Sequence, residues 1–185
     1  MVKSILIILR RYKIMTTKTH LLSGMAAPLI LPWARTPEGI VFAFAGGALG
    51  GVIADMDKLN KDLGDGRKKA GIVLGQICGW SMFLMAIIHD FMIRGLQYKY
   101  FMDMPVWERI LGILMFAIIF GYGIKFDNGS YMHTVYMGLL LSMILHLIIP
   151  SMYIEFTFGY MTHLLLDLMS GESEVRLIPA RYIMK

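Results

Sequence analysis

A histidine and an aspartate stand four residues apart in the apolar segment 159–170, GYMTHLLLDLMS. In a helix, residues i and i+4 lie on one face, so His163 and Asp167 point in the same direction and can hold one ion together. Burying these two groups without partners in an apolar environment would cost several kcal/mol. The pair therefore predicts a polar partner, a metal ion, or both.

The composition places this pair in an unusually apolar chain. The 185 residues are 57% hydrophobic and their mean hydropathy is +0.61, which is typical of a polytopic membrane domain rather than of an ordinary soluble one. Cys78 is the one cysteine, so an internal disulfide is excluded. The net charge of +5 arises from basic residues in short loops between apolar stretches, a pattern that indicates membrane orientation and argues against nucleic-acid binding.

The hydropathy pattern predicts an all-α fold, a polytopic membrane bundle of about six apolar helices, some of which cross only in part. Residues 15–185 are expected to form one membrane-embedded domain, and residues 1–14 an interfacial anchor or an upstream extension. Glycines in segment 40–54, IVFAFAGGALGGVIA, are interpreted as helix-packing positions. The predicted apolar segments are 19–32, 39–54, 70–93, 109–124, 135–150 and 152–170.

Tracing these segments as alternate crossings assigns a side to every loop. The N-terminus, the loops 56–69 and 125–134 and the C-terminal tail then share one side, which carries most of the Lys and Arg residues. By the positive-inside rule this side is cytoplasmic, so both termini are expected in the cytoplasm. The basic residues left on the opposite side are Arg35, Arg94, Lys99 and Arg109.

The same tracing brings polar residues from several segments to the cytoplasmic end of the bundle. Imidazole and carboxylate groups bind zinc and harder transition metals, and this many carboxylates allow two ions that generate hydroxide at neutral pH. Each residue also has a structural interpretation as a cap or loop residue, but their convergence favours a metal site. His89 is interpreted as interfacial and His146 as hydrogen-bonded within the bundle, both outside the site. The candidate ligands are His20, Asp55, Asp57, His133, His163 and Asp167.

Four motifs resemble those of the YdjM-like family, bacterial inner-membrane proteins described as metal-dependent hydrolases. They are THLLSG at 19–24, ADMD at 54–57, NGSYMHT at 128–134, and GYMTHLLLD at 159–167 followed by Pro179. The resemblance covers almost the whole chain from about Met15. It implies a distant likeness to the helical zinc phospholipase C and P1 nuclease group, and hence phosphoester hydrolysis in the bacterial inner membrane.

The resemblance also implies roles for the polar residues. Asp57 would be a further ligand or the general base, which makes it the catalytic candidate. Asn128 and Lys58 stand where the family has histidines. The residues implied to hold one or two divalent ions, with zinc the expected metal, are His20, Asp55, Asp57, His133, His163 and Asp167. The candidates for substrate or auxiliary contacts are Asn128, Lys58, Asp127 and Ser170.

The sequence favours two functions and gives less support to a third, metal or proton transport, for which only His146, His89 and Asp90 hint at a path. The first is a membrane-bound metal-dependent hydrolase of a phosphoester in or near the lipid, with membrane lipids as partners. The second is a non-catalytic membrane protein in which the same residues form a structural metal site or a hydrogen-bonded network. The replacements at Asn128 and Lys58 favour the second function. The oligomeric state is also open, since glycine-rich helices permit self-association without requiring it.

Overall fold

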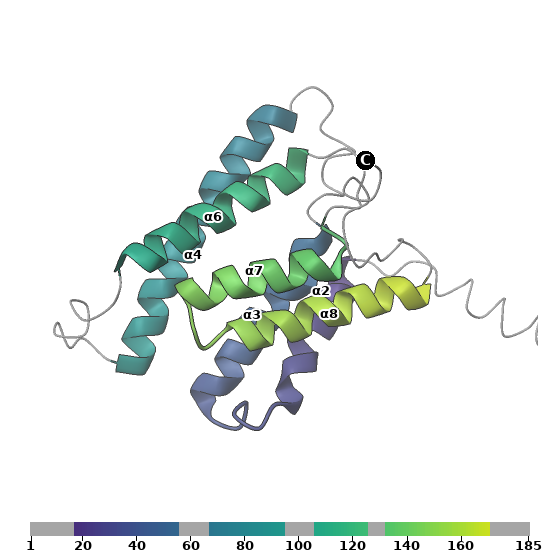
Figure 1. The fold of residues 1–185 in the computed structure, drawn as a ribbon. Coiled ribbons are helices and arrows are strands. Elements are labelled where there is room, and N and C mark those ends of the chain that lie inside the picture. Colours follow the sequence, from purple (N-terminus) through teal and green to yellow (C-terminus); the bar gives the residue numbers. More distant parts are fainter. Residues whose placement is uncertain (1–16, 56–66, 95–105, 126–131, 171–185) are drawn as a thin grey trace, which may run out of the picture.

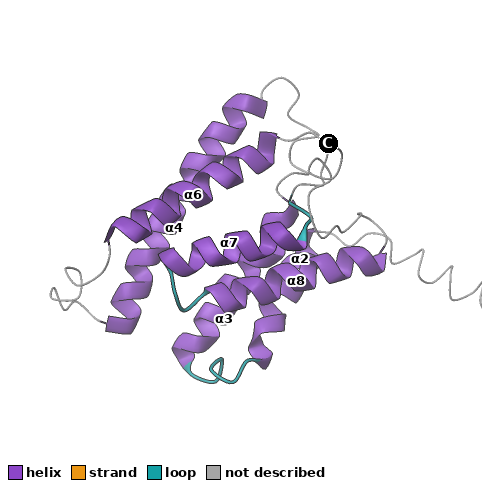
Figure 2. Cartoon of the chain, viewed as in Figure 1, coloured by secondary structure: helices purple, strands orange, loops and turns teal. Residues whose placement is uncertain are grey.

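The computed structural model describes residues 17–55, 67–94, 106–125 and 132–170, and these residues form helices joined by turns and short loops (Figures 1 and 2). Each predicted apolar segment contains helical structure, so the all-α prediction is confirmed. The predicted anchor at 1–14 lies outside the described residues. The elements are α2 (Thr17–Ala26), the 3-10 helix η1 (Ala27–Ile30), α3 (Pro37–Ile53), α4 (Arg67–Arg94), α6 (Val106–Lys125), α7 (Val135–Ile148) and α8 (Tyr153–Ser170).

Within the described ranges, no helix is both long enough and apolar enough to cross a membrane. The predicted membrane crossings therefore stay a prediction.

Helix α3 packs against both α2 and α8 because glycines on two of its faces let both neighbours approach closely. A Cβ atom at Gly47 would lie 2.1 Å from the carbonyl oxygen of Gly24 in α2. A Cβ atom at Gly50 would lie 2.2 Å from the carbonyl oxygen of Phe156 in α8. No side chain fits at such distances, so these glycines are packing positions, as predicted.

Helices α4 and α6 form an antiparallel pair beside this unit (Figure 1). Gly112 of α6 lies against Ile144 and Ile148 of α7, and α7 in turn packs on α8. The core where these helices meet contains fully buried aromatic side chains, including Phe116, Phe156 and Tyr160. This arrangement brings the start of α7 and the end of α8 to the same side of the bundle.

Large apolar side chains are also exposed, especially on α4 and α6. Trp80 on α4 is 72% exposed and Trp107 on α6 is 81% exposed. A contiguous exposed apolar surface is typical of contact with a membrane or another protein. Other exposed apolar residues of these two helices include Ile72, Val73, Ile77, Phe83, Leu84, Leu111, Leu114 and Ile118.

Candidate metal centre

Three histidines and two aspartates converge at one end of the bundle, as the sequence predicts. His20 lies in the first turn of α2, Asp55 follows the last residues of α3, and His133 precedes α7. His163 and Asp167 lie one turn apart near the end of α8. All five side chains are buried, with exposed fractions of 6% or less. Five positions that are distant in the sequence therefore form one buried polar cluster.

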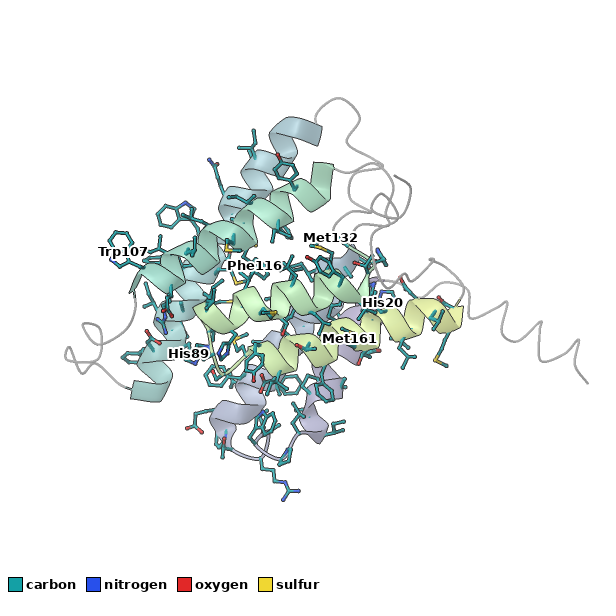
Figure 3. All side chains as sticks on the ribbon, viewed as in Figure 1. His20, His89, Trp107, Phe116, Met132 and Met161 are labelled. Carbon is teal, nitrogen blue, oxygen red and sulfur yellow. The ribbon has the colours of Figure 1, made fainter. Side chains whose placement is uncertain are left out.

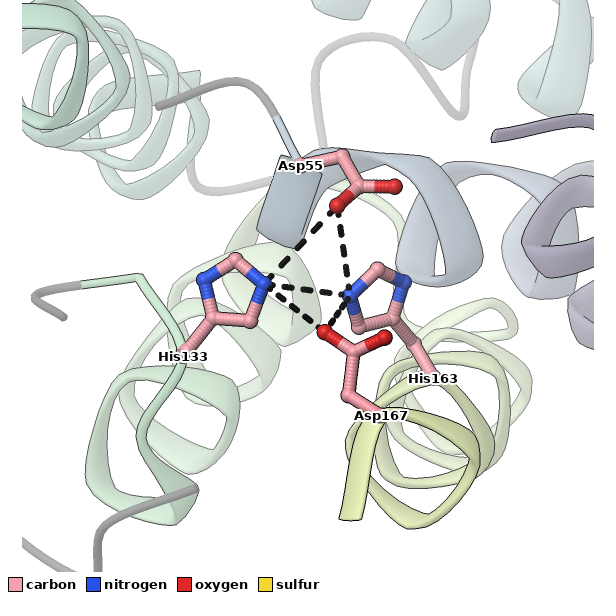
Figure 4. A group of neighbouring side chains, drawn as sticks. All are labelled: Asp55, His133, His163 and Asp167. Atoms are coloured by element: carbon pink, nitrogen blue, oxygen red, sulfur yellow. Dashed lines mark hydrogen bonds and ion pairs between the residues drawn. The ribbon is translucent and has the colours of Figure 1, made fainter. Parts of the chain in front are cut away.

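Four of these side chains direct one atom each toward a common centre (Figure 4). Asp167 Oδ2 lies 3.1 Å from His133 Nε2 and 3.4 Å from His163 Nε2, and the two nitrogens are 3.4 Å apart. Asp55 Oδ1 lies 3.8 Å and 3.6 Å from the same two nitrogens. All four atoms lie within 4.8 Å of one another. Four buried Asp and His residues are thus close enough to hold a metal ion.

The carbonyl oxygen of Gly51 sets the orientation of His163. Nδ1 of His163 lies 2.8 Å from this oxygen, and because a carbonyl oxygen only accepts, Nδ1 must carry the proton. A neutral His163 therefore presents the lone pair of Nε2 to the common centre. A carbonyl on the far ring nitrogen is a common way to orient a metal-binding histidine. The sequence interpretation treated Gly51 as a packing residue only, since a backbone carbonyl has no signature in sequence.

Two hydrogen bonds hold the short segment that carries His133. The hydroxyl of Tyr160, on α8, donates to the carbonyl oxygen of Met132. The side chain of Thr134 caps α7 by accepting from the backbone N–H of Met137 at 3.2 Å. His133 lies between these two fixed residues, so its imidazole is positioned by both α7 and α8.

His20 belongs to the cluster but not to the four converging atoms. Its Nδ1 lies 3.1 Å from Asp55 Oδ2, and its Nε2 lies 3.2 Å from Asp167 Oδ1. Asp55 Oδ2 and Asp167 Oδ1 are the outer oxygens of the two carboxylates, whereas the inner oxygens, Asp55 Oδ1 and Asp167 Oδ2, belong to the four-atom group. The structure therefore places His20 against the outer oxygens of both carboxylates, and its predicted role as a metal ligand stays a prediction.

Of the remaining predicted site residues, only Ser170 lies within the described parts of the chain. Asp57, Lys58, Asp127 and Asn128 lie outside the described residues, so the roles predicted for them stay predictions. Ser170 ends α8, and its hydroxyl donates to the carbonyl oxygen of Asp167 at 3.1 Å. This contact ties Ser170 to the backbone of a candidate ligand.

The two other histidines lie outside the four-atom group, as expected. His146 is exposed, whereas the sequence predicted a residue hydrogen-bonded within the bundle, and its ring is in edge-to-face contact with Tyr153 at 4.6 Å. His89 is buried rather than interfacial, and its Nδ1 lies 3.1 Å from Asp90 Oδ1. Its Nε2 makes a hydrogen bond with Ser151 Oγ.

Arg109 completes this second buried cluster, which the sequence interpretation missed. It donates from both terminal nitrogens to the carboxylate of Asp90, from Nη2 at 2.9 Å. The cluster joins α4, α6 and the turn between α7 and α8. The available signal was an Asp in one apolar segment and an Arg at the start of the next, since a charge inside an apolar helix needs a partner.

No family model matches this chain, and no curated protein or solved structure is significantly similar to it. The class of the protein therefore follows from the structure. In its described parts it is an all-helical protein whose buried aspartates and histidines can hold a metal ion.

Proposed function

We propose that the protein is a membrane-bound metal-dependent hydrolase whose ion is held by Asp55, His133, His163 and Asp167. The observation that carries this proposal is the spacing of their four ligand atoms. Tetrahedral ligands placed about 2.0–2.2 Å from zinc lie about 3.3–3.6 Å apart. The measured nitrogen–nitrogen and nitrogen–oxygen separations of 3.1–3.8 Å bracket this range. Zinc is therefore the proposed metal, and these four atoms account for one ion.

The residues around the centre perform distinct tasks. The carbonyl of Gly51 holds the proton of His163 at Nδ1 and keeps Nε2 available as a ligand. His20 holds both carboxylates in place through their outer oxygens. A divalent ion held by these residues would supply Lewis-acid catalysis and would activate water near neutral pH. Burial strengthens the electrostatic interactions of the site, because little bulk water is present to screen them.

Asp57 is the proposed general base or a further ligand. The support for this role is its position in the sequence, two residues after the candidate ligand Asp55. A carboxylate beside the attacking water could accept its proton while the bond from the water oxygen to phosphorus forms and the ester P–O bond breaks, with the leaving alkoxide protonated by solvent.

The proposed substrate is a phosphoester in or near the lipid. Two observations support it: the motifs that resemble the YdjM-like family, and the exposed apolar side chains of α4 and α6. The proposed location is the bacterial inner membrane, with both termini and the metal centre on the cytoplasmic side, as the distribution of basic residues favours.

A second candidate function is a non-catalytic membrane protein with a structural metal at the same site. It is favoured by Asn128 and Lys58, which stand where the resembled family has histidines. The two candidates bind the ion through the same residues and differ in whether turnover follows.

Hydrolysis by the detergent-purified full chain separates the two candidates. A panel of phosphate monoesters and diesters, including phosphatidic acid, would be tested before and after treatment with a zinc chelator. We expect the chelator to abolish hydrolysis, added zinc to restore it, and Asp167→Asn to lack it. His146→Ala, which changes an exposed histidine outside the site, is the matched control and should hydrolyse normally. Undiminished hydrolysis in chelator would refute the metal mechanism, and bound metal without any turnover would establish the second candidate.

A further inference from the structure

A groove of about 760 Å³ lies between α4 and α6, and none of the metal-centre residues lines it. Its volume is in the range of about 300–1,000 Å³ that is typical of small-molecule sites. Nearly all the side chains that line it are apolar, which favours a hydrocarbon ligand. The main lining residues on its two sides are Ile72, Trp80, Phe83, Ile110, Leu114 and Ile118.

Small residues form the floor of the groove and large ones form its walls. A Cβ atom at Gly75 would lie 3.1 Å from the carbonyl oxygen of Ala117, and one at Gly79 would lie 3.4 Å from the Ala117 side chain. The two helices therefore approach closely along this line. Leu114 and Ile118 rise beside it and are 55% and 58% exposed. The result is a long, shallow channel with an open top.

The length of the channel matches a lipid chain. On α4 the lining runs from Ile72 to Phe83, which corresponds to about 16 Å at helical rise. The hydrocarbon core of a bilayer is about 30 Å thick, so one leaflet accounts for about 15 Å. One extended lipid chain would fill the groove from end to end.

The two ends of the groove differ in polarity. Gln76 and Tyr122 contribute the polar groups of the lining, at the end where α4 begins and α6 ends. At this end the sequence of α4 opens with three consecutive basic residues, 67–69, and α6 closes with Lys125. The sequence of this end is thus rich in positive charge, which favours an anionic headgroup over a neutral one.

This end of the groove is also the end of the bundle that carries the metal centre. Helix α6 ends at Lys125, and α7, whose start is preceded by His133, begins at Val135. Helix α4 likewise begins soon after Asp55 at the end of α3. In Figure 1 the end of α6 and the start of α7 face the same side of the molecule, so this end of the groove is directed toward the side that carries His133.

We infer that the α4–α6 groove binds the hydrocarbon chain of an anionic lipid, with its phosphate at the end marked by Gln76 and Tyr122. The inference rests on the proposed function in one respect, that the bound lipid belongs to the substrate class. It narrows that class to phosphoesters of a long apolar chain and excludes small soluble phosphoesters as preferred substrates.

Native mass spectrometry of the detergent-purified full chain tests the inference, with phosphatidic acid as the probe. Leu114→Trp combined with Ile118→Trp fills the groove at two exposed positions, so folding should be retained. The matched control is Leu139→Trp on α7, where the leucine is 50% exposed and does not line the groove. We expect one phosphatidic acid per chain on the wild type and the control, and at least tenfold weaker binding to the filled variant. Diacylglycerol of equal chain length should bind at least tenfold more weakly than phosphatidic acid.

Three results would overturn the inference. The first is equal binding of phosphatidic acid to the filled variant and the wild type, and the second is equal binding of diacylglycerol and phosphatidic acid. The third is a dimer of the wild type that the two tryptophans dissociate, which would assign the groove to a second copy of the chain.

The Asp167→Asn variant separates this inference from the proposed function. It lacks a proposed metal ligand but leaves the groove intact, so it should bind phosphatidic acid as the wild type does. Lipid binding without hydrolysis by the metal-loaded wild type would uphold the groove and refute the hydrolase. Metal-dependent hydrolysis, together with lipid binding that is unchanged in the filled variant, would uphold the hydrolase and refute the groove as the lipid site.

Discussion

Two buried polar clusters lie far apart in this protein, as the positions of His89 and His20 illustrate in Figure 3, and they balance charge differently. In the cluster around Arg109, Asp90 accepts two hydrogen bonds from the guanidinium of Arg109, a group that is always charged. In the metal centre, Asp55 and Asp167 face imidazoles, whose charge depends on protonation. The proton of His163 is directed away from the centre to the carbonyl of Gly51.

The difference shows why burial alone does not identify a functional site. The negative charge of the Asp90 carboxylate is neutralised by Arg109, a residue of the same chain. This cluster therefore needs no bound ion and serves to connect the helices. In the metal centre, the lone pair of His163 Nε2 and the oxygens of two carboxylates point toward one another. Such an arrangement is stable when a cation or bound protons occupy the space between them. The direction of the donor atoms thus distinguishes the two clusters.

The largest expected effect is on metal content. His163→Ala and Asp167→Ala each remove one of four ligands from a buried centre, so we expect the bound metal to fall from at least one ion per chain to a trace. Elemental analysis of the purified protein measures this. Asp90→Asn, a change in the other cluster, is the control and should keep its metal. If both ligand variants kept their metal, His163 and Asp167 would not be metal ligands, and their cluster would have only a structural role.

The next largest effect is expected in the cluster around Arg109. Arg109→Met leaves the Asp90 carboxylate buried without its counter-charge, so the free energy of unfolding should fall by about 3–5 kcal/mol. Metal content should not change. Denaturant unfolding followed by circular dichroism measures the loss. Asp90→Leu combined with Arg109→Met should recover most of the stability, and a single variant as stable as the wild type would contradict this account.

An intermediate effect is expected for His20, which contacts only the outer oxygens of the carboxylates. His20→Gln should weaken metal binding by about 10–100-fold without abolishing it, as is usual when a residue that orients ligands is lost. Competition with a chelator of known affinity gives the change, and His146→Gln is the matched control. A loss as complete as that of His163→Ala would make His20 a ligand, as the sequence interpretation had it.

The smallest effect is expected for Ser151, which adds one hydrogen bond to His89. Ser151→Ala should lower the free energy of unfolding by about 1 kcal/mol, because one partly buried hydrogen bond is lost. Thermal unfolding measures the change, and metal affinity measured in parallel should equal that of the wild type. Weaker metal binding in this variant would show that the two clusters are coupled.

The sequence by itself determined the helical fold and most of the metal centre's membership. Hydropathy predicted the helical segments because the burial of apolar side chains is a local property of each stretch of chain. The spacing of His163 and Asp167 predicted a shared face because helix geometry is regular. Alternating the direction of successive helices was enough to bring His20, Asp55 and His133 to the same end.

Only the tertiary structure decided which atoms face one another. The close approach of α3 and α8 at Gly50 brings the carbonyl of Gly51 within reach of His163, and a backbone group has no signature in sequence. The same packing turns His20 toward the outer oxygens of the carboxylates. The pairing of Asp90 with Arg109 likewise arises between two helices. Helix spacing specifies the face on which a side chain lies, whereas ångström-scale packing between helices specifies the partner that each polar atom meets.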